Sequence, residues 1–278
     1  MKTAVIVSTY NQPAWLEKVL WGYAAQSTHD FDLVIADDGS GPATRAVLER
    51  ARTVWGQRLQ HVWHEDQGFR KCEILNRAIV AAQADYLIFT DGDCIPRRDF
   101  VATHMRLAEP RRFLSGGVIW LPRGLSEAIT QGDVESGRFA ERSWLQAQGW
   151  KAGRRGVRLL HNRTVARFLD GWTPTSASFN GHNASVWRDA LFAVNGFDAR
   201  MGYGGLDRAL GERLQNLGLR GLQVRHRAVC LHLDHDRPYR RAEVERHNRE
   251  IRARIRRHRE LRAQVGIAEL EAAAEGSL

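Results

Sequence analysis

The first hundred residues alternate short apolar runs with longer segments in which apolar residues recur at helical spacing. This alternation predicts a parallel β-sheet covered by helices, a Rossmann-like half. The predicted strands are residues 4–8, 31–36, 60–63 and 86–90, and the predicted helices are residues 13–25, 43–54 and 71–82. The last of these strands has a wholly apolar centre, as expected of a strand that is buried on both faces.

The pattern loosens after residue 120. Residues 121–178 interleave arginines with glycines and tryptophans, which favours a mostly helical insert or second lobe. Beyond the insert, residues 179–183 lead into a predicted helix near 187–194, a loop over 195–205, a helix over 206–217 and a strand over 224–231. Residues 239–264 have helical composition, with a thin apolar stripe of Val244, Ile251 and Ile255.

Polar residues gather directly after three of the predicted strands. They are Thr9, Tyr10 and Asn11 after the first strand, Asp37 and Asp38 after the second, and Asp91 and Asp93 after the fourth. In open α/β sheets, ligands bind beyond the carboxyl ends of the strands. The three groups therefore predict one ligand-binding crevice.

The composition is that of an ordinary globular protein, with 278 residues of which 43% are hydrophobic and 26% charged. It excludes collagen, a disordered tail and a small disulfide scaffold. The apolar runs fall far short of the roughly 18 residues of a membrane span, and the N-terminus lacks the features of a signal peptide, so we expect a cytoplasmic protein. Cys72, Cys94 and Cys230 form no C-x-x-C pair, which predicts buried apolar fillers.

A net charge of +9 indicates attraction to an anionic partner, whether nucleic acid, a membrane leaflet or a phosphorylated substrate. Much of the excess lies in the arginines of residues 237–262, and a second group lies in residues 154–167. Charge alone does not choose among these partners.

Two acidic motifs follow predicted strands. Asp91 and Asp93 flank Gly92, and their oxygen ligands suit Mg²⁺ or Mn²⁺, although a solvated acidic turn would have the same sequence. A carboxylate of Asp37 or Asp38 can accept hydrogen bonds from ribose hydroxyls or a base N–H, and the same segment can also cap a helix. Neither the G-x-G-x-x-G nor the P-loop fingerprint is present, which argues against dinucleotide oxidoreduction and P-loop hydrolysis.

Two further clusters lie in the C-terminal half. A glycine-rich loop delivers Asp207 at a predicted helix start, where a carboxylate is also favourable as a cap. His232 and His235 lie among carboxylates at a strand end, where they are candidates either for metal ligands or for structural histidines.

Taken together, these motifs resemble the family 2 type glycosyltransferases of GT-A fold, especially those whose C-terminal half is like that of β-1,4-galactosyltransferases. The resemblance covers roughly residues 1–240 and rests on the order of its motifs. They are VIVSTYN at 5–11, DDGS at 37–40, FRKCEILN at 69–76, DGDCIP at 91–96, LSGGV at 114–118 and GYGGLD at 202–207.

The resemblance implies a mixed, mainly parallel sheet flanked by helices, with a helical acceptor-side insert and a C-terminal helix. Within a single GT-A domain, residues 1–120 would form the half that binds the nucleotide sugar. Residues 121–236 would form the acceptor-binding and catalytic half, and residues 237–278 a basic helical tail.

The resemblance also implies roles for individual residues. Asp93, with Asp91 and either His232 or His235, would hold Mn²⁺ or Mg²⁺ against the donor diphosphate. The nucleotide contacts would be Thr9, Tyr10, Asn11, Asp37, Asp38, Phe69, Arg70, Lys71, Asn76 and Asp91. The sugar or acceptor contacts would be Trp120, Asn183, Tyr203 and Gly205, with core packing as the alternative for Trp120.

Asp207 would take the acceptor proton during an inverting attack, with an ordinary carboxyl pKa of about 3.9. Two positions depart from the family pattern. Leu206 replaces a glutamate, so the donor and acceptor preferences of better-known members do not carry over, and Tyr203 replaces a tryptophan.

The expected activity is transfer from a nucleotide sugar, expected to be UDP-linked, to a bacterial envelope glycan such as lipopolysaccharide. The arginine-rich segments would bind a phosphorylated, lipid-linked acceptor or an anionic leaflet, unless they are solvated helix faces. A sugar-phosphate nucleotidyltransferase is the alternative enzyme, but residues 9–16 lack its glycine-rich basic loop. A charge-driven nucleic-acid-binding protein would leave the acidic crevice unexplained and lacks interleaved aromatic residues, so we expect no nucleic-acid partner.

Overall fold

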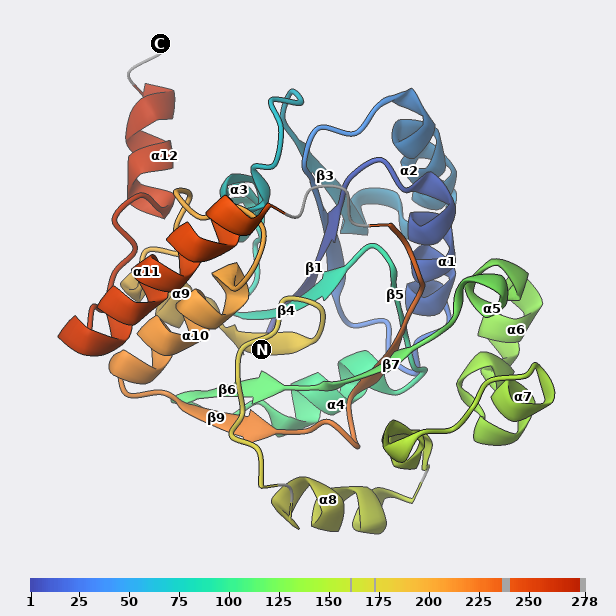
Figure 1. Cartoon of the computed structure of the whole chain (residues 1–278). Coiled ribbons are helices and arrows are strands. Elements are labelled where there is room, and N and C mark those ends of the chain that lie inside the picture. The colour runs from blue at the N-terminus through green and yellow to red at the C-terminus, as the bar shows by residue number, and fades with distance from the viewer. Residues whose placement is uncertain (161, 173, 237–240, 276–278) are drawn as a thin grey trace.

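The computed structural model describes the chain except for residues 161, 173, 237–240 and 276–278. Its largest sheet has seven strands in the order β3-β2-β1-β4-β8-β6-β9 (Figure 1). These strands are β1 (Thr3–Thr9), β2 (Asp32–Asp37), β3 (Leu59–Trp63), β4 (Tyr86–Asp91), β6 (Arg112–Ser115), β8 (Ala184–Trp187) and β9 (Arg220–Gln223). Strand β8 runs antiparallel to β4 and β6, and the other pairs are parallel. The prediction of a mixed, mainly parallel sheet is confirmed.

A second sheet of three strands has the order β5-β10-β7. Its strands are β5 (Cys94–Pro96), β7 (Gly117–Trp120) and β10 (Val229–His232). The register of β10 places His232 opposite Cys94 on one side and opposite Trp120 on the other. This small sheet therefore joins the D-G-D segment to the histidines near residue 232.

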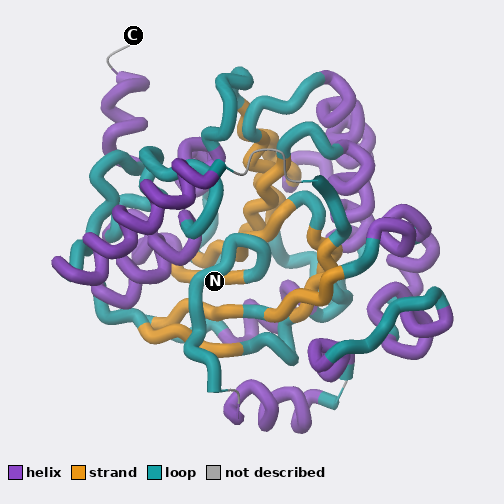
Figure 2. Tube along the Cα trace, viewed as in Figure 1, coloured by secondary structure: helices purple, strands orange, loops and turns teal. Residues whose placement is uncertain are grey.

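The central sheet is buried on both faces because its strands alternate between two apolar cores. In β1, Val5 and Val7 pack into one core, and Ala4 and Ile6 pack into the other. The helices around the sheet (Figure 2) are α1 (Pro13–Ala24), α2 (Pro42–Trp55), α3 (Lys71–Ala81), α4 (Phe100–Leu107), α9 (Arg188–Ala193), α10 (Leu206–Asn216), α11 (Ala242–His258) and α12 (Ile267–Glu275). The cysteines Cys72, Cys94 and Cys230 are free and buried, as predicted.

The segment after residue 120 is mostly helical, as predicted. Its helices are α5 (Arg123–Ala128), α6 (Gln131–Ser136), α7 (Arg142–Ala147) and α8 (Arg163–Trp172), with short 3₁₀ turns η2 (Arg138–Ala140) and η3 (Arg154–Leu159). A further 3₁₀ turn, η1 (Gly56–Arg58), precedes β3. No helix in the described part of the chain has both the length and the apolar character that crossing a bilayer requires.

The C-terminal half differs from the prediction in its strands. The strand predicted over 224–231 is confirmed only over 229–231, because the chain turns at Val224, whose carbonyl accepts from the backbone N–H groups of Arg227 and Ala228. Strand β9 ends before this turn and pairs with β6, whereas β10 follows it and joins the second sheet. The prediction also missed β8, which lies between β4 and β6. The helix predicted near 187–194 is present as α9, which begins at Arg188 directly after β8.

The helix predicted over residues 239–264 is shorter in the structure. It is α11, which ends at His258, and residues 239 and 240 lie outside the described part of the chain. Ile251 and Ile255 of the predicted apolar stripe are buried in the same core as Leu210 and Leu214 of α10. The described part of the basic C-terminal segment therefore packs against the body of the protein.

Candidate active site

The carboxyl ends of β1, β2 and β4 are tied together by hydrogen bonds. The backbone N–H of Asp38 donates to the Thr9 carbonyl at 3.0 Å, and the N–H of Gly92 donates to the Ser8 carbonyl at 2.7 Å. The Ser8 hydroxyl donates to Asp91 Oδ1 at 2.7 Å. The three strand ends that were predicted to border one crevice are therefore directly connected at this edge of the sheet.

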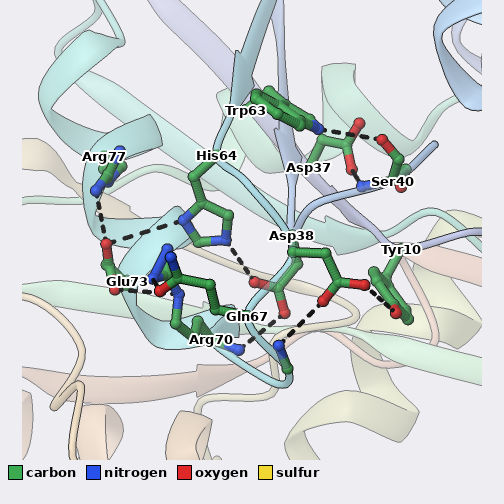
Figure 3. Close-up of polar contacts among 12 residues, drawn as sticks. Tyr10, Asp37, Asp38, Ser40, Trp63, His64, Gln67, Arg70, Glu73 and Arg77 are labelled. Atoms are coloured by element: carbon green, nitrogen blue, oxygen red, sulfur yellow. Dashed lines mark hydrogen bonds and ion pairs between the residues drawn. The ribbon is translucent and has the colours of Figure 1, made fainter. Parts of the chain in front are cut away.

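Asp38 lies at the centre of a network of charged side chains (Figure 3). Its Oδ1 lies 2.8 Å from His64 Nε2, and its Oδ2 accepts the backbone N–H of Arg70 at 3.1 Å. On its other side, His64 Nδ1 lies 3.9 Å from Glu73 Oε1 (Figure 3). His64 was not among the predicted site residues, although it directly follows β3 and so lies at a strand end like the residues that were predicted.

The neighbouring loops are shaped by Asn11 and Asp37. Asn11 has a left-handed φ of 47°, and it bonds Ser40 Oγ through its backbone N–H and the Gly41 N–H through its Oδ1. Asp37 is 1% exposed, and its two oxygens contact the Ser40 N–H and His61 Nε2. Asp37 is thus occupied within the fold, whereas the ring of Tyr10 is 44% exposed while its hydroxyl donates to Asp66.

Lys71 and Asp91 form an ion pair with 2.6 Å between Nζ and Oδ1. Burial lowers the pKa of Lys71, but Asp91 and Asp207 outweigh that effect and raise it above its ordinary value. Burial likewise raises the pKa of Asp91, and Lys71 more than reverses this and holds it well below the usual range. Both groups are therefore charged at neutral pH.

Asp207 is the second residue of α10, which follows a glycine loop that ends at Gly205, whose φ is +81°. The loop from Gly181 lies so close that a Cβ there would come within 2.5 Å of Asp207 Oδ1, which explains the glycine at 181. This Oδ1 is buried with no hydrogen-bond partner in the described structure. Burial raises the pKa of Asp207 to about 6 against the opposing effect of Lys71, so the expectation of an ordinary pKa is wrong.

Asp93, His232 and His235 form a second cluster. The Nδ1 atoms of His232 and His235 lie 2.7 Å and 2.8 Å from the carbonyl oxygens of Leu233 and Asp236, so each Nδ1 carries a proton and donates it. In the neutral rings this leaves lone pairs on both Nε2 atoms, 3.5 Å and 2.8 Å from the Asp93 carboxylate. Lone pairs facing a carboxylate repel unless a proton or a cation lies between them. These three side chains therefore offer the donor set of a divalent-cation site.

The candidate cation ligands in this cluster are carboxylate and imidazole groups. The ligand atoms of Asp93, Cys94 and His232 lie within 4.8 Å of one another. Burial raises the pKa of the Cys94 thiol well above its ordinary value, so sulfur is a poor ligand here. Imidazole and carboxylate oxygen together suit ions such as Mn²⁺. Of the four predicted metal ligands, Asp91 alone is directed elsewhere, toward Lys71 and Ser8.

Aromatic side chains border these clusters. The indole of Trp120 stacks on His232 with ring centroids 4.0 Å apart and is 40% exposed, so the alternative of simple core packing is wrong. The ring of Tyr203 meets Phe69 edge-on at 6.0 Å, which brings the glycine loop of residues 202–205 against the start of α3.

Residues 4–151 match the model of glycosyl transferase family 2. The chain belongs to this family. Among curated relatives of this family 2 chain, the validoxylamine A glucosyltransferase of Streptomyces hygroscopicus subsp. jinggangensis is 28% identical over 229 residues, covering 78% of this chain and 52% of the relative. The uncharacterized glycosyltransferase YfnE of Bacillus subtilis is 23% identical and covers 84% of this chain and 65% of that protein. The chain thus spans about half the length of the first of these relatives.

Solved structures agree on the fold. Residues 1–349 of TarS from S. aureus, in complex with UDP-GlcNAc, align with a TM-score of 0.64 and 15% identity, covering 97% of this chain and 69% of TarS 1–349. The mannosyltransferase PcManGT from Pyrobaculum calidifontis, in complex with GDP-Man and Mn²⁺, aligns with a TM-score of 0.55 and 23% identity, covering 94% and 61%. The fold of this family 2 chain is GT-A, as the resemblance implied, whereas the likeness to β-1,4-galactosyltransferases stays a prediction.

Two predicted ligand contacts of the family 2 chain lie in its core. Asn76 is fully buried and exchanges two hydrogen bonds with the backbone of Phe197, both at 2.8 Å. Asn183 is also fully buried, and its amide contacts the carbonyls of Gly117 and Ala228 and the ring of His104. Neither side chain is accessible to a ligand in this structure, because the amide groups join segments of the fold.

The sequence argument also missed His182, next to Asn183. Burial lowers the pKa of His182 to about 4, although Asp91 opposes this, so the ring is neutral at pH 7. Its electrostatic neighbours include Asp91, Asp93 and His232, which places it between the two clusters. Neither spacing nor periodicity distinguishes such a histidine, since only the fold brings it to the site.

Proposed function

We propose that the protein is a metal-dependent, inverting glycosyltransferase that moves a sugar from a UDP-linked donor to a hydroxyl group of a glycan. One observation carries this proposal. The carboxylates of Asp91 and Asp93, and that of Asp207 from a distant part of the chain, all lie within electrostatic range of Lys71. Asp93 belongs to the histidine cluster, and Asp207 presents a buried oxygen with no partner in the described structure.

The residues that would hold a divalent cation are Asp93, His232 and His235. When bound, Mn²⁺ or Mg²⁺ supplies a Lewis acid that stabilises the charge of a departing nucleoside diphosphate. Lys71 adds a fixed positive charge to the same region, and it keeps Asp91 ionised. We therefore assign this side of the site to stabilising the departing nucleoside diphosphate.

Asp207 is the proposed general base. Its raised pKa of about 6 leaves the carboxylate mostly ionised at pH 7 and makes it a stronger base than an ordinary aspartate. The unpartnered Oδ1 is the proposed acceptor of the hydroxyl proton, since buried acceptors normally have a donor. Attack by that hydroxyl oxygen on the anomeric carbon, opposite the leaving diphosphate, would invert the configuration.

The other predicted contacts divide into two proposed groups. Tyr10 offers an exposed ring against a nucleobase, whereas both oxygens of Asp38 are bonded within the fold, where they hold His64 and the Arg70 backbone. Trp120 and Tyr203 offer aromatic faces to sugar rings. TarS and PcManGT were solved with UDP-GlcNAc and GDP-Man, which supports a nucleotide sugar as the donor class.

We further propose a lipid-linked envelope glycan, such as a lipopolysaccharide precursor, as the acceptor at the cytoplasmic face of an anionic membrane. Free buried cysteines are consistent with a reducing compartment. A nucleotidyltransferase and a nucleic-acid-binding protein are not favoured, since family membership and the acidic crevice both point to sugar transfer.

The test is to incubate the protein with a panel of nucleotide sugars, with and without Mn²⁺, and to measure released nucleoside diphosphate in the presence of candidate acceptors. We expect metal-dependent release from a UDP-sugar. Asp207→Asn should abolish release, and the exposed neighbour Arg208→Gln is the control for changes at the start of α10. Absence of metal-dependent release or binding with every donor would contradict the proposal.

A further inference from the structure

Helix α8 carries an exposed apolar stripe. Val165, Phe168 and Trp172 are 40%, 64% and 77% exposed, and their spacing of three and four residues places them on one face of the helix. The rings of Phe168 and Trp172 lie 5.7 Å apart. In Figure 1 the helix lies at the lower edge of the molecule. Large side chains gathered and exposed in this way indicate an interaction surface.

The opposite side of α8 is anchored to the body of the protein. Ala166 and Asp170 are buried there. Asp170 Oδ1 accepts the backbone N–H of His226 and contacts its Nδ1, both at 2.9 Å, and Oδ2 pairs with Arg227 Nε at 2.6 Å. A rotation of α8 that turned the apolar stripe inward would break these buried contacts of the Asp170 carboxylate. The fold therefore holds the apolar side chains outward.

A strongly basic cavity of about 470 Å³ adjoins the anchored side of α8. It lies between α8, the α4 region and the turn before β10. Its lining contains two carboxylates, Asp99 and Glu109, against six arginines, which are Arg97, Arg106, Arg112, Arg163, Arg167 and Arg227. Within the described residues, no ion pair neutralises Arg106, Arg163 or Arg167. The cavity therefore favours anions such as phosphate groups.

We propose that α8 docks the protein on an anionic phospholipid bilayer. The stripe of Val165, Phe168 and Trp172 enters the boundary between headgroups and acyl chains, and the exposed arginines of α8 that line the adjoining cavity, Arg163 and Arg167, receive lipid phosphates. A short helix with a charged face and aromatic residues opposite has the composition of an interfacial helix. Three side chains on one short helix offer far less area than the roughly 800 Å² per partner of a stable protein interface, which favours lipid over a second protein.

This inference deepens the acceptor side of the proposed function, because docking would bring the site to a lipid-linked glycan. Only the biological purpose of docking rests on the proposed function, because lipid binding itself requires neither a nucleotide-sugar donor nor sugar transfer. The experiment therefore contains no nucleotide sugar, so that its failure and a failure of transfer are distinguishable.

The experiment measures co-sedimentation of the full chain with vesicles of phosphatidylcholine alone, or mixed in equal parts with phosphatidylglycerol. We expect binding to the mixed vesicles and little to the neutral ones. The double substitution Phe168→Ser and Trp172→Ser should lower the partition coefficient roughly tenfold or more. Both side chains are mainly exposed, so the variant should keep the wild-type melting temperature. Val54→Ser with Leu261→Ser removes two exposed apolar side chains elsewhere and should bind like wild type.

A second pair of variants tests the arginines. Arg163→Gln with Arg167→Gln should weaken binding to the anionic vesicles, whereas Arg249→Gln with Arg257→Gln on α11 should change it much less. The inference is overturned if wild type fails to bind, if the α8 variants bind equally well, or if either control pair loses as much. It is also overturned if wild type is a dimer in solution that the Phe168 and Trp172 substitutions dissociate, because the stripe would then be an interface between copies.

Discussion

A single carboxyl group combines three unusual features at the residue scale. Asp207 lies two residues after a glycine in a left-handed conformation, faces a second glycine at close distance, and has a buried oxygen with no partner in the described part of the chain. Burial of its charged form is unfavourable, which is the main reason that its pKa rises to about 6. Such a group is suited to proton transfer near neutral pH, and it lowers the stability of the folded protein there.

The sign of this stability effect can be tested in the metal-free protein. The folded pKa of Asp207 is raised, so the folded state binds the proton more tightly than the unfolded state between about pH 4 and pH 6. Its contribution to stability is therefore present below pH 4 and is lost as the pH rises through 6. We expect Asp207→Asn to have a higher melting temperature than wild type at pH 7.5, and the difference to shrink toward pH 4.

The matched control is Asp30→Asn, which alters an exposed carboxylate in the loop before β2. Its difference from wild type should be small at both pH values. If Asp207→Asn were less stable than wild type at pH 7.5, the carboxylate would be stabilising the fold, and the argument from burial would be wrong.

Strand-end reasoning predicts part of the site at this scale. Asp93 and His235 follow strands and His232 ends one, and the fold brings all three together. The pKa of Asp207 could not be predicted, because it depends on burial and on Lys71, which only the fold supplies. The same reason applies to Asn183, since its motif carries no sign that the side chain lies in the core.

At the scale of elements, α11 positions the loop that leads to Asp207. Asn248 Nδ2 donates to the carbonyls of Gly202, Tyr203 and Gly204, at 3.0, 3.1 and 2.8 Å. Glycine-rich backbone has few conformational restraints of its own. The loop that carries the proposed base is therefore ordered from outside, by a helix that the sequence argument treated as a tail.

Asn248→Ala should both destabilise the protein and slow transfer. Loss of the amide leaves the loop carbonyls without their donor, which costs about 1–3 kcal/mol of unfolding free energy. A displaced base should lower kcat by roughly tenfold to a hundredfold at saturating substrates. Chemical denaturation and steady-state rates measure the two effects.

Asn216→Ala is the control for this prediction. Asn216 lies at the other end of α10, and its Nδ2 donates to the carbonyls of Ile255 and Glu260. Its loss should destabilise the fold by a similar amount with little change in kcat. Equal losses of kcat in both variants would mean that general destabilisation, and not the position of the loop, controls the rate.

The regular elements of residues 1–91 are predictable because β1, β2, β3 and β4 have 7, 6, 5 and 6 residues and the first three are each followed by a helix. The strands of the C-terminal half are four residues each, and local pattern cannot say which sheet they join. Residues 224–228 contain neither glycine nor proline to mark the turn between β9 and β10. Pairing with distant strands decides these elements, which is why β9 was not predicted and β10 is shorter than the strand predicted over 224–231.

At the scale of the whole molecule, the proposed site depends on two sheets and the helical segments around them. The central sheet supplies Asp91, the second sheet supplies His232, and α10 supplies Asp207. Tethering of Asn183 to Gly117 and Ala228 holds the start of β8 against β7 and β10. Ligands that span the strand ends should therefore stabilise the entire fold.

Ligand-induced stabilisation can therefore test the proposed metal ligand and the proposed base separately. UDP with Mn²⁺ at about a hundred times the dissociation constant should add about 2.7 kcal/mol to the unfolding free energy of wild type. Asp93→Ala should lose the metal-dependent part of this gain, because it removes the proposed carboxylate ligand. Asp207→Asn should retain it, because the base acts on the acceptor. Asp234→Ala changes an exposed carboxylate that lies between His232 and His235 in the chain, and it should behave like wild type. Melting curves with UDP alone, Mn²⁺ alone and both together measure each contribution, and equal losses in Asp93→Ala and Asp207→Asn would contradict the division of roles.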